Sequence, residues 1–127
     1  MNEASAEDNM PPSSVDSLLQ RALSHHQAGR LDQAVSLYCQ VLNSDPNHLD
    51  ALNFGGAAFF QSGENTQALE MLRKAVRLAP DYAEAHNNLG KVLHESGNSE
   101  ESLVCFERAL ELKPDYLEAK NNLGLAL

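Results

Sequence analysis

The chain has 127 residues, of which 43% are hydrophobic, 21% charged and 6% aromatic, so it fits one globular domain or a short array of repeats. Acidic residues number 18 and basic residues 9, and the formal net charge of -9 has the wrong sign for binding a nucleic-acid backbone. No run approaches the roughly 20 apolar residues of a membrane span, and residues 1–11 lack the basic start and apolar middle of a signal peptide. We therefore expect a cytoplasmic protein that binds neither nucleic acid nor membranes.

The first 11 residues are rich in Asn, Glu, Ser, Ala and Asp. Such a composition buries too little apolar surface to offset the entropy lost on ordering. We expect residues 1–11 to form a disordered acidic tail.

A period of 34 residues runs through the rest of the chain, and such a period indicates a repeat architecture. It appears in four series of residues: Pro12, Pro46, Pro80 and Pro114; Gly29, Gly63 and Gly97; Ala22, Gly56, Gly90 and Gly124; and Ala34, Ala68 and Ser102. Because these series share one period, we predict three full units, at about residues 12–45, 46–79 and 80–113, and a partial fourth at residues 114–127.

Each unit is predicted to form two helices, here called helix A and helix B. A polar residue follows each proline and an acidic residue comes three positions later, as in the capping box that opens a helix. These pairs are Ser13 and Asp16, Asn47 and Asp50, Asp81 and Glu84, and Asp115 and Glu118. Apolar residues at helical spacing follow until Gly29, Gly63 or Gly97 supplies the left-handed residue that ends helix A. Helix B then has to end before the next proline.

Three glycines, Gly56, Gly90 and Gly124, fall inside helix A. Glycine inside a helix costs about 1 kcal/mol relative to alanine, so its recurrence needs a reason. We expect it to admit a close approach of helix B at the small residues Ala68 and Ser102.

These residues resemble the tetratricopeptide repeat, whose 34-residue period carries a Trp, Leu-Gly, Tyr, Ala, Phe, Pro pattern. In the third unit the matching residues are Leu89, Gly90, Leu93 in place of Tyr, Ser102 in place of Ala, Phe106 and Pro114. No unit keeps the Trp. The resemblance covers residues 12–127 and implies an all-α fold, a right-handed α-solenoid of three full repeats plus a partial fourth. It implies no particular function.

The sequence offers no convincing catalytic or metal site, and we expect neither enzymatic activity nor a cofactor. His25 and His26 are adjacent and point about 100° apart on a helix, whereas metal ligands need to share a face. His94 lacks the second histidine of an H-E-x-x-H motif. Cys39 and Cys105 fall in the middle of predicted helices B, two units apart, where buried, unpaired and inert thiols are expected.

One acidic residue recurs near the start of every helix A and forms a column along the array. Its members are Asp16, Asp50, Glu84 and Glu118. Stabilisation of the helix dipole explains the column and is the favoured interpretation, and it is compatible with the alternative of a cation-binding stripe.

A stack of helix pairs curves, and its concave wall, lined by helix A, gives an extended binding surface. The resemblance places a peptide-binding groove at recurring helix A positions, namely Asn53, Phe54, Phe60, Asn87, Asn88, Lys91, Asn121 and Asn122, with Leu19, Gln20, Leu23, Ala57 and Leu125 beside them. The family's chaperone adaptors hold acidic C-termini with a clamp of Lys, Asn and Arg. At the matching positions this chain has Leu19, Leu23, Phe54, Glu84 and Asn88, so the clamp is absent.

The A-x-N-N-L-G runs at residues 85–90 and 119–124 resemble the superhelical arm of O-linked N-acetylglucosamine transferases and similar bacterial proteins. In that arm, stacked asparagines hold the backbone of an extended peptide. Asn88 and Asn122 match this ladder, whereas Gln20 and Phe54 depart from it. The alternative is that these asparagines are exposed and only solvated, and in either case we expect their replacement to leave the melting temperature nearly unchanged.

We therefore predict a non-catalytic protein–protein interaction module, or scaffold, that binds a segment of another protein on the concave surface. The competing hypothesis is the N-terminal recognition arm of a longer enzyme, such as a glycosyltransferase or sulfotransferase, with its catalytic domain beyond Leu127. Leu123 and Leu127 stand where Leu89 and Leu93 would pack against a following helix B. We accordingly expect either a fragment of a longer repeat protein or self-association through the last helix.

Overall fold

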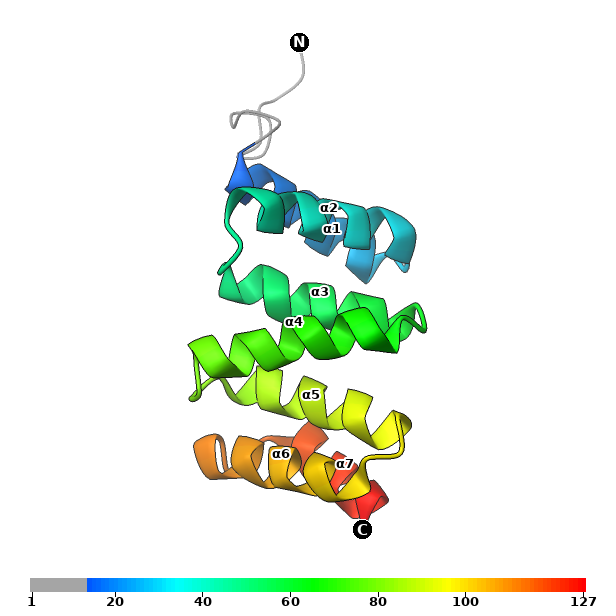
Figure 1. The fold of residues 1–127 in the computed structure, drawn as a ribbon, viewed down its shortest axis with the longest axis vertical. Helices are drawn as coiled ribbons and strands as arrows, with labels where there is room; N and C mark the ends of the chain where they lie inside the picture. The colour runs from blue at the N-terminus through cyan, green and yellow to red at the C-terminus, as the bar shows by residue number, and fades with distance from the viewer. Residues whose placement is uncertain (1–13) are drawn as a thin grey trace.

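The computed structural model describes residues 14–127, which form seven α-helices and no strand. The helices are α1 (Val15–Gln27), α2 (Leu31–Ser44), α3 (Leu49–Gln61), α4 (Asn65–Leu78), α5 (Ala83–Glu95), α6 (Ser99–Leu112) and α7 (Leu117–Ala126). They stack one pair after another from the N-terminal to the C-terminal end (Figure 1). The predicted all-α repeat fold is therefore confirmed, whereas the tail expected at residues 1–11 lies outside the described residues.

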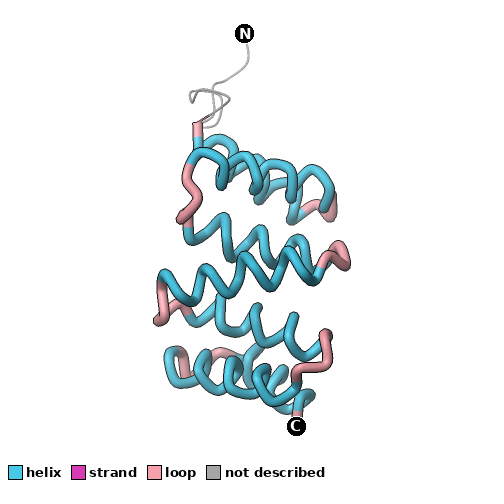
Figure 2. Tube along the Cα trace, viewed as in Figure 1, coloured by secondary structure: helices cyan, strands magenta, loops and turns pink. Residues whose placement is uncertain are grey.

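The helices form two layers, with helices A (α1, α3, α5 and α7) in one and helices B (α2, α4 and α6) in the other. Throughout residues 14–127 each helix contacts its neighbours in sequence, and each helix A also contacts the helix A of the next unit. The short loops lie along the two edges of the stack (Figure 2). We call the surface formed by α1, α3, α5 and α7 the helix A face. Among residues 14–127, none of the helices combines the length and the apolar composition that a membrane span requires.

Left-handed glycines end α1, α3 and α5, as predicted. Gly29, Gly63 and Gly97 have φ angles of 80°, 83° and 89°. The residue after each glycine donates its backbone N–H to a carbonyl in the last turn, as Arg30 N does to His25 O at 2.9 Å. This bond satisfies a carbonyl that the end of the helix would otherwise leave unpaired.

The capping-box prediction is wrong by one residue, because the helices A begin later than expected. Their N-cap residues are Ser14, His48, Tyr82 and Tyr116. The Pro-Asn or Pro-Asp pair before the last three forms a turn instead, as in the bond from His48 N to Asp45 O at 3.1 Å. The acidic residues of the predicted column still lie in the first turn of each helix, where they oppose the positive end of the helix dipole.

Gly56 and Gly90 make room for large side chains, so the prediction that they face Ala68 and Ser102 is wrong. A Cβ atom at Gly56 would lie 2.6 Å from Cγ of Leu72. A Cβ atom at Gly90 would lie 2.6 Å from Cε1 of Phe106. Each glycine therefore lets a bulky, fully buried residue of helix B reach the backbone of helix A.

Candidate functional site

A chain of hydrogen bonds links α3 and α5 beneath the helix A face. The Tyr82 hydroxyl donates to Asp50 Oδ1 at 3.1 Å, and Asn53 Nδ2 donates to the Tyr82 oxygen at 3.1 Å. Asn88 Nδ2 then donates to Asn53 Oδ1 at 2.8 Å. Because an ionised carboxylate only accepts hydrogen bonds, Asp50 fixes the direction of every bond in this chain.

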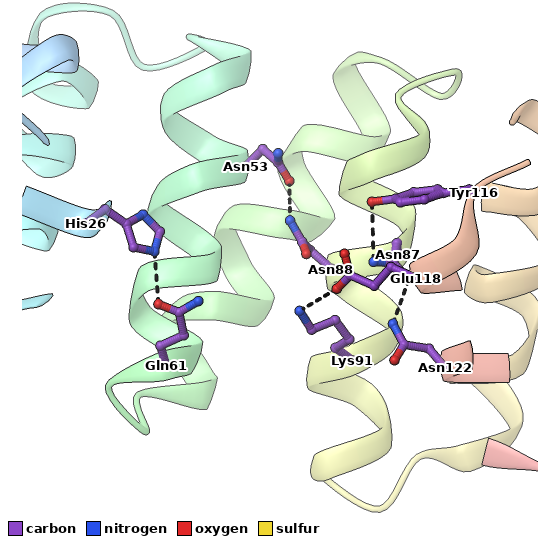
Figure 3. A network of polar contacts seen from close by, with 9 residues as sticks. All are labelled: His26, Asn53, Gln61, Asn87, Asn88, Lys91, Tyr116, Glu118 and Asn122. Atoms are coloured by element: carbon purple, nitrogen blue, oxygen red, sulfur yellow. Dashed lines mark hydrogen bonds and ion pairs between the residues drawn. The ribbon is translucent and has the colours of Figure 1, made fainter. Parts of the chain in front are cut away.

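The tyrosine–asparagine–asparagine part of this arrangement recurs one repeat later. Asn87 Nδ2 donates to the Tyr116 hydroxyl at 3.4 Å, and Asn122 Nδ2 donates to Asn87 Oδ1 at 2.9 Å (Figure 3). The bond to Tyr116 is longer than its counterpart at Tyr82, so the second network is held more loosely at its base.

The structure divides four of the five predicted asparagines into two kinds. Asn53 and Asn87 are 2% and 0% exposed, so the expectation that their side chains face a groove is corrected. Their buried amides are satisfied by bonds to Tyr82 and Tyr116, two residues that the sequence reasoning missed. Asn88 and Asn122 are half-buried at the helix A face, each fixed by one of the buried asparagines.

Both tyrosines of these networks stay protonated at neutral pH. Burial raises the pKa of Tyr116 to about 12, with smaller contributions from Glu118 and Glu84. Burial also raises the pKa of Tyr82 well above its usual range, and the Asp50 carboxylate raises it further. Each hydroxyl is therefore available as a donor and an acceptor throughout the physiological range.

Two carboxylates of the acidic column carry lysine partners. Lys91 Nζ lies 3.0 Å from Glu118 Oε2, and Lys113 Nζ lies 3.3 Å from Glu84 Oε2. Residues 14–127 contain no group of three or more His, Cys, Asp or Glu side chains placed to hold a metal ion. Ion pairs with lysine therefore add to the predicted dipole interaction at Glu84 and Glu118, and the described residues offer no cluster of ligands for a cation-binding stripe.

A pocket of about 300 Å³ opens between α3, α5 and α7, with α6 contributing to its lining. It brings together three predicted site residues, Phe60, Lys91 and Asn122. The remaining lining residues are His94, Glu95, Phe106 and Leu125. Of the other candidates, Phe54 packs partly buried against the N-terminal core and Asn121 is exposed on α7.

Neither cysteine has the environment of a nucleophile. Both thiols are free, and burial raises the pKa of Cys105 to about 11 and also raises that of Cys39. A raised pKa keeps the thiol protonated at neutral pH, and the thiolate is the reactive form.

Family models match most of the array. Tetratricopeptide repeat models match residues 15–48 and 83–116, and a further model of this repeat matches residues 56–97. No curated protein matches the chain.

Solved structures share the fold. A Thermobaculum terrenum O-GlcNAc transferase is similar over 98% of this chain, with 31% identity and a TM-score of 0.87, but the chain covers only 23% of that protein. MamA from Desulfovibrio magneticus is similar over 90% of this chain and 64% of its own, with 25% identity and a TM-score of 0.83. The first TPR of Spaghetti (RPAP3), bound to an HSP90 peptide, covers 92% of this chain and 93% of its own, with 24% identity and a TM-score of 0.85.

Proposed function

Because the chain belongs to the tetratricopeptide repeat family, we propose that it is a non-catalytic protein-interaction module that binds a segment of a partner protein on its helix A face. An array of repeats offers a long surface in place of a deep cleft, which suits an extended or helical segment. Contacts between successive helices A make this face continuous.

The paired placement of Asn88 and Asn122 carries the proposal. Both residues are half-buried, and each donates one side-chain N–H to the oxygen of a buried asparagine. A carboxamide has two N–H donors and an acceptor oxygen, so each retains the capacity to bond a backbone N–H and C=O of a ligand. A side chain that is already fixed loses little entropy on binding. The asparagine carboxamides would bond the backbone of the peptide and not the peptide's side chains.

The partner segment differs from an acidic chaperone tail. RPAP3 is the neighbour that holds an HSP90 peptide. The family's clamp for such tails needs cationic and amide donors, and here Leu19, Phe54 and Glu84 occupy three of its positions. The net charge of -9 on the chain would also repel an acidic ligand.

The similarity to the Thermobaculum terrenum transferase favours a second candidate function, the substrate-recognition arm of a longer enzyme. In that case the same helix A face would present a protein substrate to a catalytic domain elsewhere in the chain. Sequencing the full-length transcript tests this candidate, since an open reading frame that continues into a transferase domain supports it and one that does not contradicts it.

Peptides selected from a random display library against the purified chain test the interaction function directly. Affinities are then compared for the double variant Asn88→Ala with Asn122→Ala and for Asn43→Ala, a control at an exposed position of α2. We expect the double variant to bind roughly tenfold or more weakly, since each lost bond contributes about 1 kcal/mol. We expect the control to bind as the unchanged protein does.

The double variant is also expected to melt at a lower temperature, because it leaves the buried oxygens of Asn53 and Asn87 without donors. This corrects the expectation that the melting temperature would be nearly unchanged. Affinities are therefore measured at a temperature where circular dichroism shows both variants folded. Equal affinities in all three proteins would contradict binding at these asparagines, and a library that yields no binder would contradict the interaction function itself.

A further inference from the structure

A polar contact joins the C-terminal ends of α1 and α3, and the equivalent positions one repeat later hold residues that cannot form it. His26 Nε2 and Gln61 Oε1 lie 2.9 Å apart across the helix A face (Figure 3). Thirty-four residues further on, the same two positions hold Phe60 on α3 and Glu95 on α5. A phenyl ring has no hydrogen-bonding group, so this pair cannot form the same bond.

Both residues instead line the 300 Å³ pocket between α3, α5 and α7. Phe106, only 1% exposed, contributes the buried part of its apolar lining, and Leu125, 79% exposed, stands at its rim. Glu95 is exposed beside them. The pocket therefore combines an apolar interior with a carboxylate at the edge.

The charge around the pocket is acidic on balance. Lys91 lies in the lining, but its ammonium group is bound to Glu118 at 3.0 Å. The carboxylate in the lining is that of Glu95, and the whole chain carries a net charge of -9. Such a field attracts basic segments and repels acidic ones.

We propose that this pocket takes a bulky apolar side chain, such as leucine, from a basic partner segment, and that a flanking lysine or arginine of the segment reaches Glu95. The inference rests on the proposed function, because the segment is the one bound at the helix A face. It adds the chemistry of the recognised residue. Asn122 lines the same pocket, so the backbone that carries the apolar residue passes within reach of one ladder carboxamide.

Three pools of biotinylated decapeptides test this chemistry. They are random except at three central positions, which are Lys-Leu-Lys, Glu-Leu-Glu or Lys-Gly-Lys. We expect the Lys-Leu-Lys pool to bind about tenfold or more tightly than either of the others, because burial of a leucine side chain and the flanking charges both contribute. Binding of this pool should weaken as salt is added.

A double variant, Phe60→His with Glu95→Gln, introduces the residue pair found one repeat earlier and is designed to close the pocket with a hydrogen bond. We expect it to lose about tenfold or more of its affinity for the Lys-Leu-Lys pool while it remains folded. Val104→Ala serves as the matched control, since Val104 is an exposed apolar residue of α6 outside this pocket. Should the double variant unfold, Leu125→Gln at the exposed rim gives the same comparison with little effect on the core.

Two results would overturn the inference and leave the proposed function standing. One is equal binding of the Lys-Leu-Lys pool by the unchanged chain and the closed-pocket variant. The other is equal binding of the three pools, or none, when library-selected peptides do bind and depend on Asn88 and Asn122. Failure of the library selection itself would count against both proposals.

Discussion

The Asp50 carboxylate sets the direction of the hydrogen bonds in the chain that runs through Tyr82 and Asn53 to Asn88. Its carboxylate accepts from the Tyr82 hydroxyl, so the tyrosine oxygen is left to accept from Asn53. Asn53 must then present its own oxygen to Asn88. A residue at the start of α3 thereby fixes which way a carboxamide on α5 is turned, and with it what that carboxamide offers to a ligand.

Replacing Tyr82 with Phe tests this dependence. The change removes both a donor to Asp50 and the acceptor of the buried Asn53 Nδ2, so we expect the free energy of unfolding to fall by about 1–3 kcal/mol. Tyr116→Phe breaks only the longer 3.4 Å bond from Asn87 and should cost less. Urea unfolding followed by circular dichroism measures both. An equal loss in the two variants would show that the hydrogen bonds to Tyr82 do not hold the network.

The A-x-N-N-L-G runs indicate that Asn88 and Asn122 occupy equivalent positions, because these positions repeat in sequence, and their part in binding stays a prediction. The burial of Asn53 and Asn87 was not predictable in the same way. Each bonds a tyrosine 29 residues ahead, and such a partner is found only when the helices are stacked. Tyr82 and Tyr116 do recur at the 34-residue period, which is the one sequence signal that could have identified them.

At the scale of helices, the contact of helix A with its own helix B depends on a glycine in the second and third units. Phe106 reaches the backbone of α5 because Gly90 has no Cβ, and Leu72 reaches α3 at Gly56 in the same way. The third glycine of the series, Gly124, has no heavy atom within 4 Å of the place a Cβ would occupy. The absence of a Cβ is therefore required for packing at Gly56 and Gly90, and it is not required at Gly124 on α7.

Gly90→Ala and Gly124→Ala should consequently act in opposite directions. The first forces a methyl group against the buried Phe106 ring, and such overpacking costs about 1–3 kcal/mol. The second adds helix propensity worth up to about 1 kcal/mol without a clash. Melting temperatures of the two variants check the pair. A stabilised Gly90→Ala variant would mean that Phe106 can move aside at little cost.

The order of the helices followed from the periods of glycine and proline, since both residues act locally on the backbone. Their starts and contacts were harder to predict. The Pro-Asn and Pro-Asp pairs are typical of a turn as well as of a helix cap. In the structure they form a turn, so the residue after each pair is the N-cap of the helix. The choice of Leu72 and Phe106 as glycine partners depends on how the two helices pack in three dimensions, which residue size alone does not reveal.

At the scale of the whole molecule, the three tyrosines are spread along the array and all are protonated in the fold. Burial raises the pKa of Tyr38 and of Tyr116 to about 12 and raises that of Tyr82 as well. An unfolded tyrosine titrates near about 10. Above that pH the unfolded chain releases protons that the folded chain still holds, so the tyrosine contribution to stability is complete below about pH 10 and declines above it.

We therefore expect the melting temperature to fall between about pH 10 and pH 12. Lysines also titrate in this range, so the tyrosines need a readout of their own. Absorbance of tyrosinate in the folded chain should appear at a pH about two units above that in urea-unfolded chain, as expected from values near 12 and about 10. Coincident titrations in the two states would contradict the burial of these hydroxyls.

The last helix differs from the other helices A in what covers it. Leu117, Leu125 and Leu127 are 68%, 79% and 83% exposed, and the contacts of α7 within the described chain are with α5 and α6 alone. In a repeat array each unit is stabilised by its neighbours, so α7 should exchange its amide hydrogens faster than α3 or α5.

Self-association through this surface stays a prediction, and it depends on the same leucines. Two copies that meet at α7 would remove them from water, so the mean mass measured by light scattering should rise with protein concentration. Leu117→Gln with Leu127→Gln should abolish that rise and leave the melting temperature of a dilute sample unchanged, because neither side chain is part of the buried core. A monomer at every concentration, together with slow exchange throughout α7, would show that the helix is stable with its leucines exposed and that no second copy covers it.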